Sequence, residues 1–394
     1  MPYAFAQRVG GMGGSAIREI LKITERPDII SFAGGLPAPE MFPRTGLAEA
    51  FAQVLREEDG LALQYSSTEG YGPLREYIAG VMRQKGVAVT AEEILITSGS
   101  QQGLDLVAKL FLDPGDVVAT ELPVYTGALQ VFRSYEGRLK AIPGDEHGPD
   151  PVALEIVIRE SRPKLIYLAP TFNNPTGMTV SEARRRALVV LCEKYAVPLI
   201  EDDPYGDLRY SGIPVPPVKA FDAGGRVIYL GTFSKTVAPG LRLGWVAAER
   251  ELVARLALAK QGADLHTGTL VQRALHRYLT GSDSGGHVEA IRREYGRRRD
   301  AMAGALNGTF PPGIQWNEPE GGMFFWVTLP AHLDAAELLP EAVAEKVAFV
   351  PGAAFFPAGG GENFLRLNFT NSPPPLIGEG IGRLARVLAR HWSG

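Results

Sequence analysis

The 394-residue chain contains one cysteine, Cys192, and six histidines, which do not have the spacing of metal ligands. A single cysteine excludes an internal disulfide and a cysteine metal cluster. Cys192 lies in an apparent helix over 181–195 beside Leu188, Val189 and Leu191. That setting predicts a packed core thiol and not a nucleophile. The sequence therefore predicts no metal site.

An excess of positive charge is also absent, since the formal net charge is −4. The short basic stretch over 292–299 has the spacing of a solvated helix face and not of a groove that follows phosphates, so no nucleic-acid partner is expected. The sequence has no apolar run long enough to span a bilayer and no signal-peptide pattern at its start. These absences predict a cytoplasmic protein without a membrane partner.

What the chain does contain is ample core material, because 45% of its residues are hydrophobic. Short apolar runs alternate with helical patterns from about residue 92 to 280, which predicts an α/β fold with a mostly parallel sheet of seven strands between helices. The last run follows its predecessor without a helix, so it is expected to be the antiparallel member. The predicted strands are 93–98, 116–120, 138–142, 165–169, 197–201, 226–231 and 242–247, and the helices between them include 101–112, 124–135, 181–195 and 249–261.

After about residue 285 the pattern changes to a long charged helix, short strands and a C-terminal helix. This change predicts a smaller α+β domain over 286–394, which the N-terminal segment 1–39 completes, beside a large domain over 40–285. The glycines in Gly11-Met-Gly-Gly-Ser-Ala16 have the spacing of a dinucleotide-binding loop, but no buried strand precedes them, so a hinge is the better interpretation.

The most informative segment is Gly231-Thr-Phe-Ser-Lys-Thr-Val-Ala-Pro-Gly-Leu-Arg242, which follows a buried strand. The amine of Lys235 can bond covalently to an aldehyde. Thr232, Ser234 and Arg242 can hold a dianionic phosphate through charge-assisted hydrogen bonds. Together these residues predict a site for a phosphorylated aldehyde.

Other strand ends carry matching chemistry. Asp202 follows an apolar strand and could stabilise a protonated ring nitrogen, while Tyr205 and Asn174 could donate hydrogen bonds to a ring phenolate oxygen. Ser100 and Gln101 follow another strand at a glycine-rich turn that opens a helix, which is a typical anion site. In the segment Phe364–Phe369, polar and apolar residues alternate, which predicts a strand with one apolar face and with Arg366 on the other.

These motifs, in this order along the chain, resemble the fold-type I aminotransferases that use pyridoxal 5'-phosphate. The resemblance implies that Lys235 bonds the cofactor and shuttles the alpha proton, and that Asp202 holds the pyridine nitrogen. It also implies that Arg366 clamps the substrate α-carboxylate. The resemblance further implies that Asn174 and Tyr205 contact the phenolate oxygen of the cofactor and that Tyr125 stacks on its ring. The phosphate contacts that it implies come from Ser100, Gln101, Thr232, Ser234 and Arg242. Gly35, Asn174 and Tyr65 are expected to contact the substrate, and Tyr65 is also expected to reach the phosphate of the neighbouring subunit in a homodimer.

Within that family, the stretches 31–43, 63–75, 260–267 and 347–356 are similar to the 2-aminoadipate aminotransferases of lysine biosynthesis and to the kynurenine/2-aminoadipate enzymes. This similarity implies that Arg18 reads a distal carboxylate of the substrate. Arg18 also fits the polar face of an ordinary amphipathic helix, and Lys22 or Arg26 could serve the same carboxylate.

The implied reaction moves an amino group from 2-aminoadipate or glutamate to 2-oxoglutarate or 2-oxoadipate. Alternatives are a broad-specificity aminotransferase for leucine-like or aromatic amino acids, and another reaction of the same cofactor such as that of a beta-lyase. A ligand sensor of the kind found fused to DNA-binding domains is disfavoured, because fewer than a hundred residues precede the first cofactor motif.

Overall fold

The computed structural model describes residues 3–11, 26–58, 60–281 and 284–391. Its central element is a seven-stranded sheet in which six strands run in one direction and β10 runs antiparallel to both of its neighbours. Both the largely parallel sheet and its antiparallel member are therefore confirmed. In sheet order the strands are β2 (Ile94–Thr97), β10 (Gly244–Ala247), β9 (Val227–Thr232), β8 (Leu199–Asp202), β7 (Leu165–Leu168), β3 (Val117–Thr120) and β4 (Arg138–Ala141).

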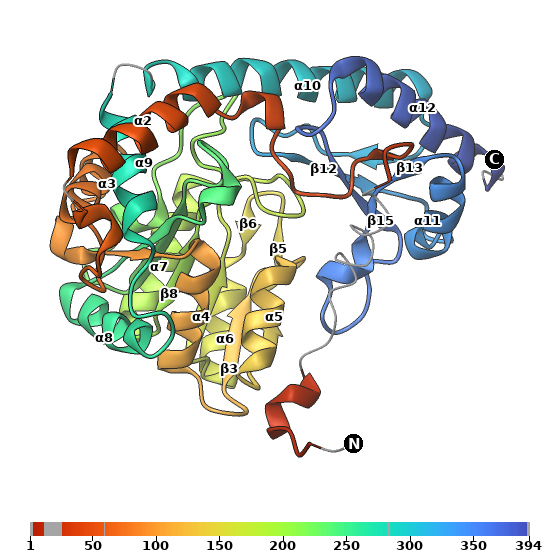
Figure 1. The fold of residues 1–394 in the computed structure, drawn as a ribbon. Helices are drawn as coiled ribbons and strands as arrows, with labels where there is room; N and C mark the ends of the chain where they lie inside the picture. The colour runs from red at the N-terminus through yellow and green to blue at the C-terminus, as the bar shows by residue number, and fades with distance from the viewer. Residues whose placement is uncertain (1–2, 12–25, 59, 282–283, 392–394) are drawn as a thin grey trace.

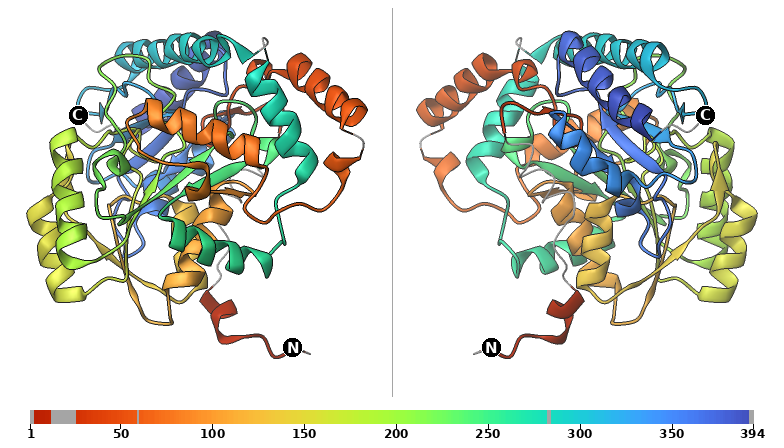
Figure 2. Two further views of the ribbon diagram at one scale, coloured as in Figure 1. Left: turned by 90° about the vertical axis from the view of Figure 1, so that its left-hand side faces the viewer. Right: turned by 90° about the vertical axis from the view of Figure 1, so that its right-hand side faces the viewer.

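Helices cover both faces of this sheet (Figure 1, Figure 2). Alternation of side chains along the strands explains the two layers, since Leu95 packs with one set of helices and Ile94 and Ile96 with the other. One face carries α4 (Ser100–Phe111), α5 (Thr126–Ser134) and α8 (Arg250–Gln261). The other carries α3 (Gly72–Gln84), α6 (Pro151–Ser161), α7 (Glu182–Tyr195) and α9 (Thr269–Thr280), with α2 (Arg44–Glu57) against α9.

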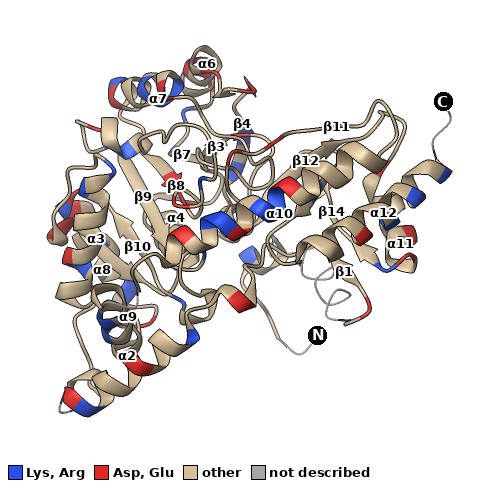
Figure 3. Ribbon diagram, turned by 90° about the horizontal axis from the view of Figure 1, so that it is seen from above, with Lys and Arg blue, Asp and Glu red and all other residues tan. Residues whose placement is uncertain are grey.

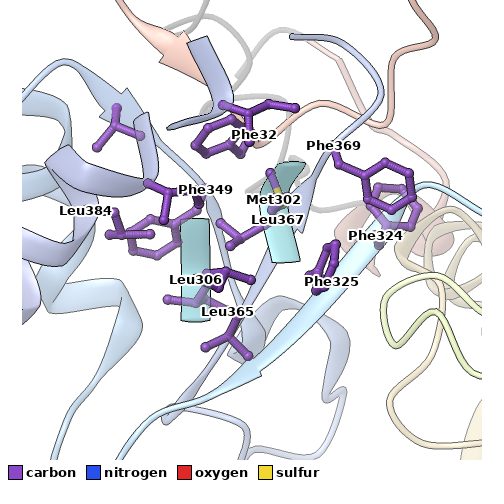
Figure 4. Close-up of a cluster of buried hydrophobic side chains, with 14 of the residues drawn as sticks. Phe32, Met302, Leu306, Phe324, Phe325, Phe349, Leu365, Leu367, Phe369 and Leu384 are labelled. Atoms are coloured by element: carbon purple, nitrogen blue, oxygen red, sulfur yellow. The ribbon is translucent and has the colours of Figure 1, made fainter. Parts of the chain in front are cut away.

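A second, antiparallel sheet has the order β11 (Gln315–Trp316), β12 (Phe324–Thr328), β15 (Phe364–Asn368) and β14 (Val350–Pro351). Figure 4 shows its apolar core, to which β12 gives Phe324 and Phe325 and β15 gives Leu365 and Leu367. Around it lie α10 (His287–Thr309), α11 (Ala335–Ala344) and α12 (Pro374–Arg390). The short strand β1 (Ile30–Ser31) pairs with β13 (Val347–Ala348). The domain boundaries at 39 and 285 stay a prediction.

Several details differ from the sequence prediction. The apolar stretch 347–351 is divided into β13 and β14, which belong to different sheets. Nothing in the sequence indicated that the polar residues of β15 are themselves buried, but Arg366 and Asn368 are 2% and 1% exposed. The hairpin of β5 (Gly144–Asp145) and β6 (Gly148–Pro149) was not predicted.

The basic stretch of α10 is only partly a solvated face. Acidic and basic residues alternate along this helix in Figure 3, and Arg293 and Arg297 are exposed. Arg298, however, is 2% exposed, pairs with Glu40 and Glu294, and donates to the Thr370 carbonyl. Because these acceptors come from distant segments, the spacing on α10 alone could not reveal them. In the described part of the chain, no helix combines the length and apolar character needed to cross a bilayer.

Candidate active site

The predicted site residues meet at the carboxyl edge of the large sheet. Loops after β2, β3, β7, β8 and β9 lie at this edge, together with the start of β10, because those five strands are parallel to one another. A cavity of about 460 Å³ opens there. Its walls include Gly35, Ser100, Gln101, Tyr125, Asn174, Asp202, Tyr205, Thr232, Ser234, Lys235, Arg242 and Arg366, all of which were named from the sequence.

The cavity is predominantly cationic. Lys235, Arg242 and Arg366 line it, whereas the carboxylate among the lining residues is Asp202. A second cavity of about 490 Å³ lies beside Lys85 and Asp207. There, Lys85 Nζ is already 2.8 Å from Asp207 Oδ1, and Arg209 pairs with Glu320. The first cavity is the better candidate for an anionic ligand, because its cations have no such carboxylate partners among the described residues.

Lys235 projects from the loop after β9. Its Nζ donates a hydrogen bond to the carbonyl oxygen of Gly35 at 2.9 Å, in the segment that follows β1. Burial lowers the pKa of the amine to about 8, and the positive charges of Arg366 and Arg242 act in the same direction. About a tenth of the amine is therefore unprotonated at neutral pH, which a nucleophile or a base requires.

Asp202, the last residue of β8, has its two carboxylate oxygens in different environments. Oδ2 accepts a hydrogen bond from the Tyr167 hydroxyl at 2.8 Å, while Oδ1 is buried without a hydrogen-bond partner among the described residues. Burial raises the pKa of Asp202 to about 6, although the Tyr167 bond opposes the rise; neighbouring Asp203 adds to it. An unpartnered buried carboxylate oxygen is costly, so Oδ1 marks a position for a donor that is bound from solution.

Arg366 reaches the cavity from β15 in the second sheet. One terminal nitrogen donates to Asn174 Oδ1 at 2.6 Å and the other to the Ala33 carbonyl at 2.5 Å. The guanidinium lies over the Phe324 ring, 4.2 Å from its centroid, and Nε has no hydrogen-bond partner among the described residues. Burial lowers the pKa of Arg366 to about 10. A buried guanidinium without a carboxylate is suited to an anionic group from a ligand.

The side chains of Tyr205 and Asn174 lie next to this arginine. Burial raises the pKa of Tyr205 well above its ordinary value, so the phenol stays protonated and can donate a hydrogen bond. Because Asn174 Oδ1 is taken by Arg366, the amide nitrogen of Asn174 is left as its donor toward the cavity.

The anion cradle is built from two loops. Helix α4 begins at Ser100, and its first backbone amides have no acceptor within the helix. In the facing loop, Thr232 Oγ1 donates to Ser234 Oγ at 2.9 Å and accepts from the Ser234 amide at 3.1 Å. Gly99 has φ of +80°, and a Cβ there would be 2.4 Å from an Arg242 nitrogen. Glycine is therefore required for Arg242 to lie over the helix start.

Tyr65 and Arg26, which were also named from the sequence, do not line the cavity. Tyr65 is 78% exposed, with its ring 5.8 Å from that of His266. A contact from Tyr65 to another subunit stays a prediction. Arg18 and Lys22 lie outside the described residues. Arg26 does not line the cavity and instead pairs with Asp28 at 3.1 Å.

Sequence reasoning assigned no role to Tyr167, Gln130 or Leu36, which also line the cavity. Tyr167 stands in the apolar run of β7, where a tyrosine resembles any other core residue. The one feature of the sequence that could have indicated a role is the hydroxyl itself, since a buried phenol needs a hydrogen-bond partner. Glu121 was also missed; its Oε1 accepts from the Ala169 amide below the site, and burial raises its pKa to about 7.

Comparison with known proteins agrees with this geometry. The profile of the family "Aminotransferase class I and II" matches residues 30–384. The chain is 47% identical over 389 residues to the 2-aminoadipate transaminase of Thermus thermophilus (98% of this chain, 96% of that protein), and 46% identical over 390 residues to aromatic-amino-acid aminotransferase 1 of Thermococcus litoralis (98% and 94%).

Among solved structures, one is the alpha-aminoadipate aminotransferase LysN from Thermus thermophilus, complexed with N-(5'-phosphopyridoxyl)-L-leucine. Its sequence is 44% identical to this one, the TM-score is 0.91, and the match covers 98% of this chain and 97% of that chain. Since the family profile spans most of the sequence and the relatives match over nearly their full length, the chain belongs to the class I and II aminotransferases and is a transaminase that depends on pyridoxal 5'-phosphate.

Proposed function

We propose that this aminotransferase takes the amino group of 2-aminoadipate or glutamate and passes it to 2-oxoglutarate or 2-oxoadipate. The observation that carries the proposal is the position of Arg366 in the same cavity as Lys235 and Asp202, as a buried guanidinium without a carboxylate partner in the described part of the chain. This arrangement can orient the α-carboxylate of an amino acid beside a reactive amine.

The residues present fit the cofactor. Asp202 Oδ1 is a buried acceptor to which no described residue donates, which suits a protonated ring nitrogen. Tyr205 and Asn174 supply donors for the ring oxygen, and Tyr125 provides a face for stacking. Arg242, Thr232, Ser234, Ser100 and Gln101 form the phosphate cradle in this proposal.

When bound, pyridoxal phosphate supplies an aldehyde for the amino group and a ring that withdraws electrons from the substrate's alpha carbon. Lys235 Nζ would hold that aldehyde covalently in the resting enzyme. Once the substrate amine has displaced it, the freed Lys235 amine would accept the proton from the alpha carbon and return it on the cofactor side. Its depressed pKa makes the neutral amine available for both roles. Asp202 would keep the ring nitrogen of the bound cofactor protonated, and Arg366 would hold the substrate in the orientation that the proton transfer needs.

Tests of this assignment use Lys235→Ala. We expect the variant to retain cofactor without a covalent bond and to lose transamination by about 10³-fold or more. Borohydride reduction of the wild-type protein should attach the cofactor to the peptide that contains Lys235, as mass spectrometry can show. Turnover by Lys235→Ala at the wild-type rate would falsify the assignment.

The described residues define the cofactor site more closely than the pocket for the substrate side chain, which selects the amino donor. Leu36 and Gln130 line the cavity, and no lining residue beyond Lys235, Arg242 and Arg366 is a cation in the described ranges. In this proposal a distal carboxylate is bound by Arg18, with Lys22 as the alternative cation, whereas leucine-like or aromatic side chains could pack on Leu36. A broad-specificity aminotransferase is accordingly the second candidate.

Parallel kinetics with 2-aminoadipate, glutamate and leucine separate the two candidates. Loss of the cofactor's visible absorption band gives the rate of the first half-reaction. Arg18→Gln should lower kcat/KM for 2-aminoadipate about tenfold to hundredfold and leave leucine unchanged. Arg26→Gln is the matched control, because Arg26 is already paired with Asp28. If leucine is the best donor and Arg18→Gln has no effect, the dicarboxylate proposal is wrong.

We further propose a homodimer in which Tyr65 contacts the phosphate site of the partner subunit. Tyr65 lies among exposed apolar residues, which include Leu61, Leu63 and Leu265 at 60%, 71% and 47% exposure. Sedimentation of the purified protein tests the dimer directly, and a monomer that retains full activity would contradict it. The cytoplasmic location stays a prediction.

A further inference from the structure

The hydrogen bond below Asp202 follows from the register of two neighbouring strands. β7 and β8 are parallel, and Tyr167 is opposite Ile200. Asp202, two residues after Ile200, therefore points to the same face of the sheet as Tyr167. The Tyr167 hydroxyl donates to Asp202 Oδ2 at 2.8 Å.

The tyrosine ring is held firmly in place. Tyr167 has no exposed surface and its ring meets Phe132 edge to face, with 5.6 Å between centroids. A fixed donor at Oδ2 restricts rotation of the carboxylate, so Oδ1, which has no partner in the described chain, has a defined direction.

Asp202 lines the same cavity as the cations Lys235, Arg242 and Arg366, but burial and the neighbouring Asp203 oppose its ionisation. Asp203 and Glu121 carry like charge when ionised, and the phenols of Tyr125 and Tyr205 carry no positive charge. Burial and Asp203 raise the pKa of Asp202, whereas the bond from Tyr167 lowers it. The Tyr167 hydroxyl is thus the hydrogen-bond donor that favours the ionised carboxylate of Asp202 in the described structure.

We propose that Tyr167 is a positioning residue that, through its bond to Oδ2, keeps the Asp202 carboxylate turned with Oδ1 toward the cofactor's ring nitrogen. The inference rests on the proposed role of Asp202. Tyr167 acts through that carboxylate and makes no contact with substrate in this assignment.

The matched control is a second buried tyrosine on the other face of the sheet. Tyr229 of β9 is 2% exposed, and its hydroxyl donates to Asp203 Oδ2, also at 2.8 Å. Tyr167→Phe and Tyr229→Phe each remove one hydroxyl from one buried carboxylate. Their effects on folding should therefore be similar, while their effects on the cofactor should differ.

We expect Tyr167→Phe to lower kcat about tenfold or more with little change in KM. In a plot of kcat/KM against pH, the acidic limb should shift to higher pH by about one unit, because the Asp202 carboxylate then ionises at higher pH. The apoprotein should also bind pyridoxal phosphate about tenfold more weakly, as titration of protein fluorescence measures without turnover. Tyr229→Phe should leave the profile and cofactor affinity unchanged.

Asp202→Asn separates failure of this inference from failure of the proposed function. If Asp202→Asn keeps wild-type cofactor affinity and rate, the role of Asp202 is wrong. If Asp202→Asn loses both but Tyr167→Phe matches Tyr229→Phe in every readout, the inference about Tyr167 alone is overturned. A double variant in which Tyr167→Phe adds no further loss to Asp202→Asn would support it, since the two residues act as one unit.

Discussion

Replacement of Arg366 by methionine should separate activity from stability. In the free protein, the guanidinium is buried, and its pKa falls to about 10. At about 1.4 kcal/mol per unit, this shift from the ordinary arginine value corresponds to about 3 kcal/mol of unfavourable burial. Arg366→Met removes that penalty and places a thioether over the Phe324 ring, which is a favourable contact.

The same substitution leaves Asn174 Oδ1 and the Ala33 carbonyl without their donor. Each loss costs about 1–3 kcal/mol, so the two effects nearly cancel. We expect the free energy of unfolding of the apoprotein to change by less than about 2 kcal/mol. The loss of activity, unlike the loss of stability, is not offset by the removal of a buried charge. Loss of two charge-assisted hydrogen bonds to the substrate should lower kcat/KM by about 10²–10⁴.

Single-turnover absorbance and urea unfolding measure the two quantities. Arg185→Met is the control, because Arg185 is fully buried but lies 3.8 Å from Glu201 and donates to the Pro170 and Pro216 carbonyls. It should cost about 3–5 kcal/mol of stability. A primary amine that lacks the α-carboxylate should react equally with wild type and Arg366→Met. If Arg366→Met keeps kcat/KM within tenfold, or is as unstable as Arg185→Met, the reasoning is refuted.

Three further predictions concern the same site. Lys235 has a folded pKa of about 8, below the ordinary lysine value of 10.5, so the apoprotein should gain about 3 kcal/mol as pH rises through this window. Urea unfolding at several pH values should show that Lys235→Met lacks this gain, and parallel curves would contradict the burial of the amine. Gly99→Ala places a Cβ against the Arg242 guanidinium, so the affinity of the apoprotein for the cofactor should fall about tenfold or more. A fluorescence titration measures this affinity, and an unchanged value would contradict the proposed phosphate site. If the dimer proposal is correct, mixing the Tyr65→Ala and Lys235→Ala variants should restore activity. A hybrid dimer then has one intact site, with Lys235 from one subunit and Tyr65 from the other. Hybrid dimers without activity would contradict a shared site.

Much of the fold could be predicted because apolar strands and polar loop chemistry alternate along the chain. The observed β2, β3, β7, β8, β9 and β10 begin or end within two residues of the prediction. The antiparallel direction of β10 followed from the missing helix before it. Local patterns sufficed here, because these strands are buried on both faces and the loops after the five parallel ones lie at the same edge of the sheet.

Other features depend on partners that are distant in sequence. Arg298 looks like its exposed neighbours until Glu40 and the Thr370 carbonyl are placed beside it. Tyr167 is one apolar residue among several until the register of β7 and β8 brings it to Asp202. Similarly, the polar face of β15 is buried because Arg366 hydrogen-bonds to Asn174, which belongs to a loop of the other sheet. Periodicity reports which residues are buried but not what they meet.

The way buried charges are satisfied distinguishes the candidate site from the rest of the interior. Lys260 is buried and bonded to Asp264, just as Arg185 has Glu201 and Arg298 has Glu40. Lys235 and Arg366, by contrast, hydrogen-bond to neutral oxygens in the described structure, and both have depressed pKa values. Such groups destabilise the free protein, and an anionic ligand relieves that destabilisation only in the folded state. Binding of the cofactor and a substrate carboxylate should therefore stabilise this fold by more than the same ligands would through contact area alone.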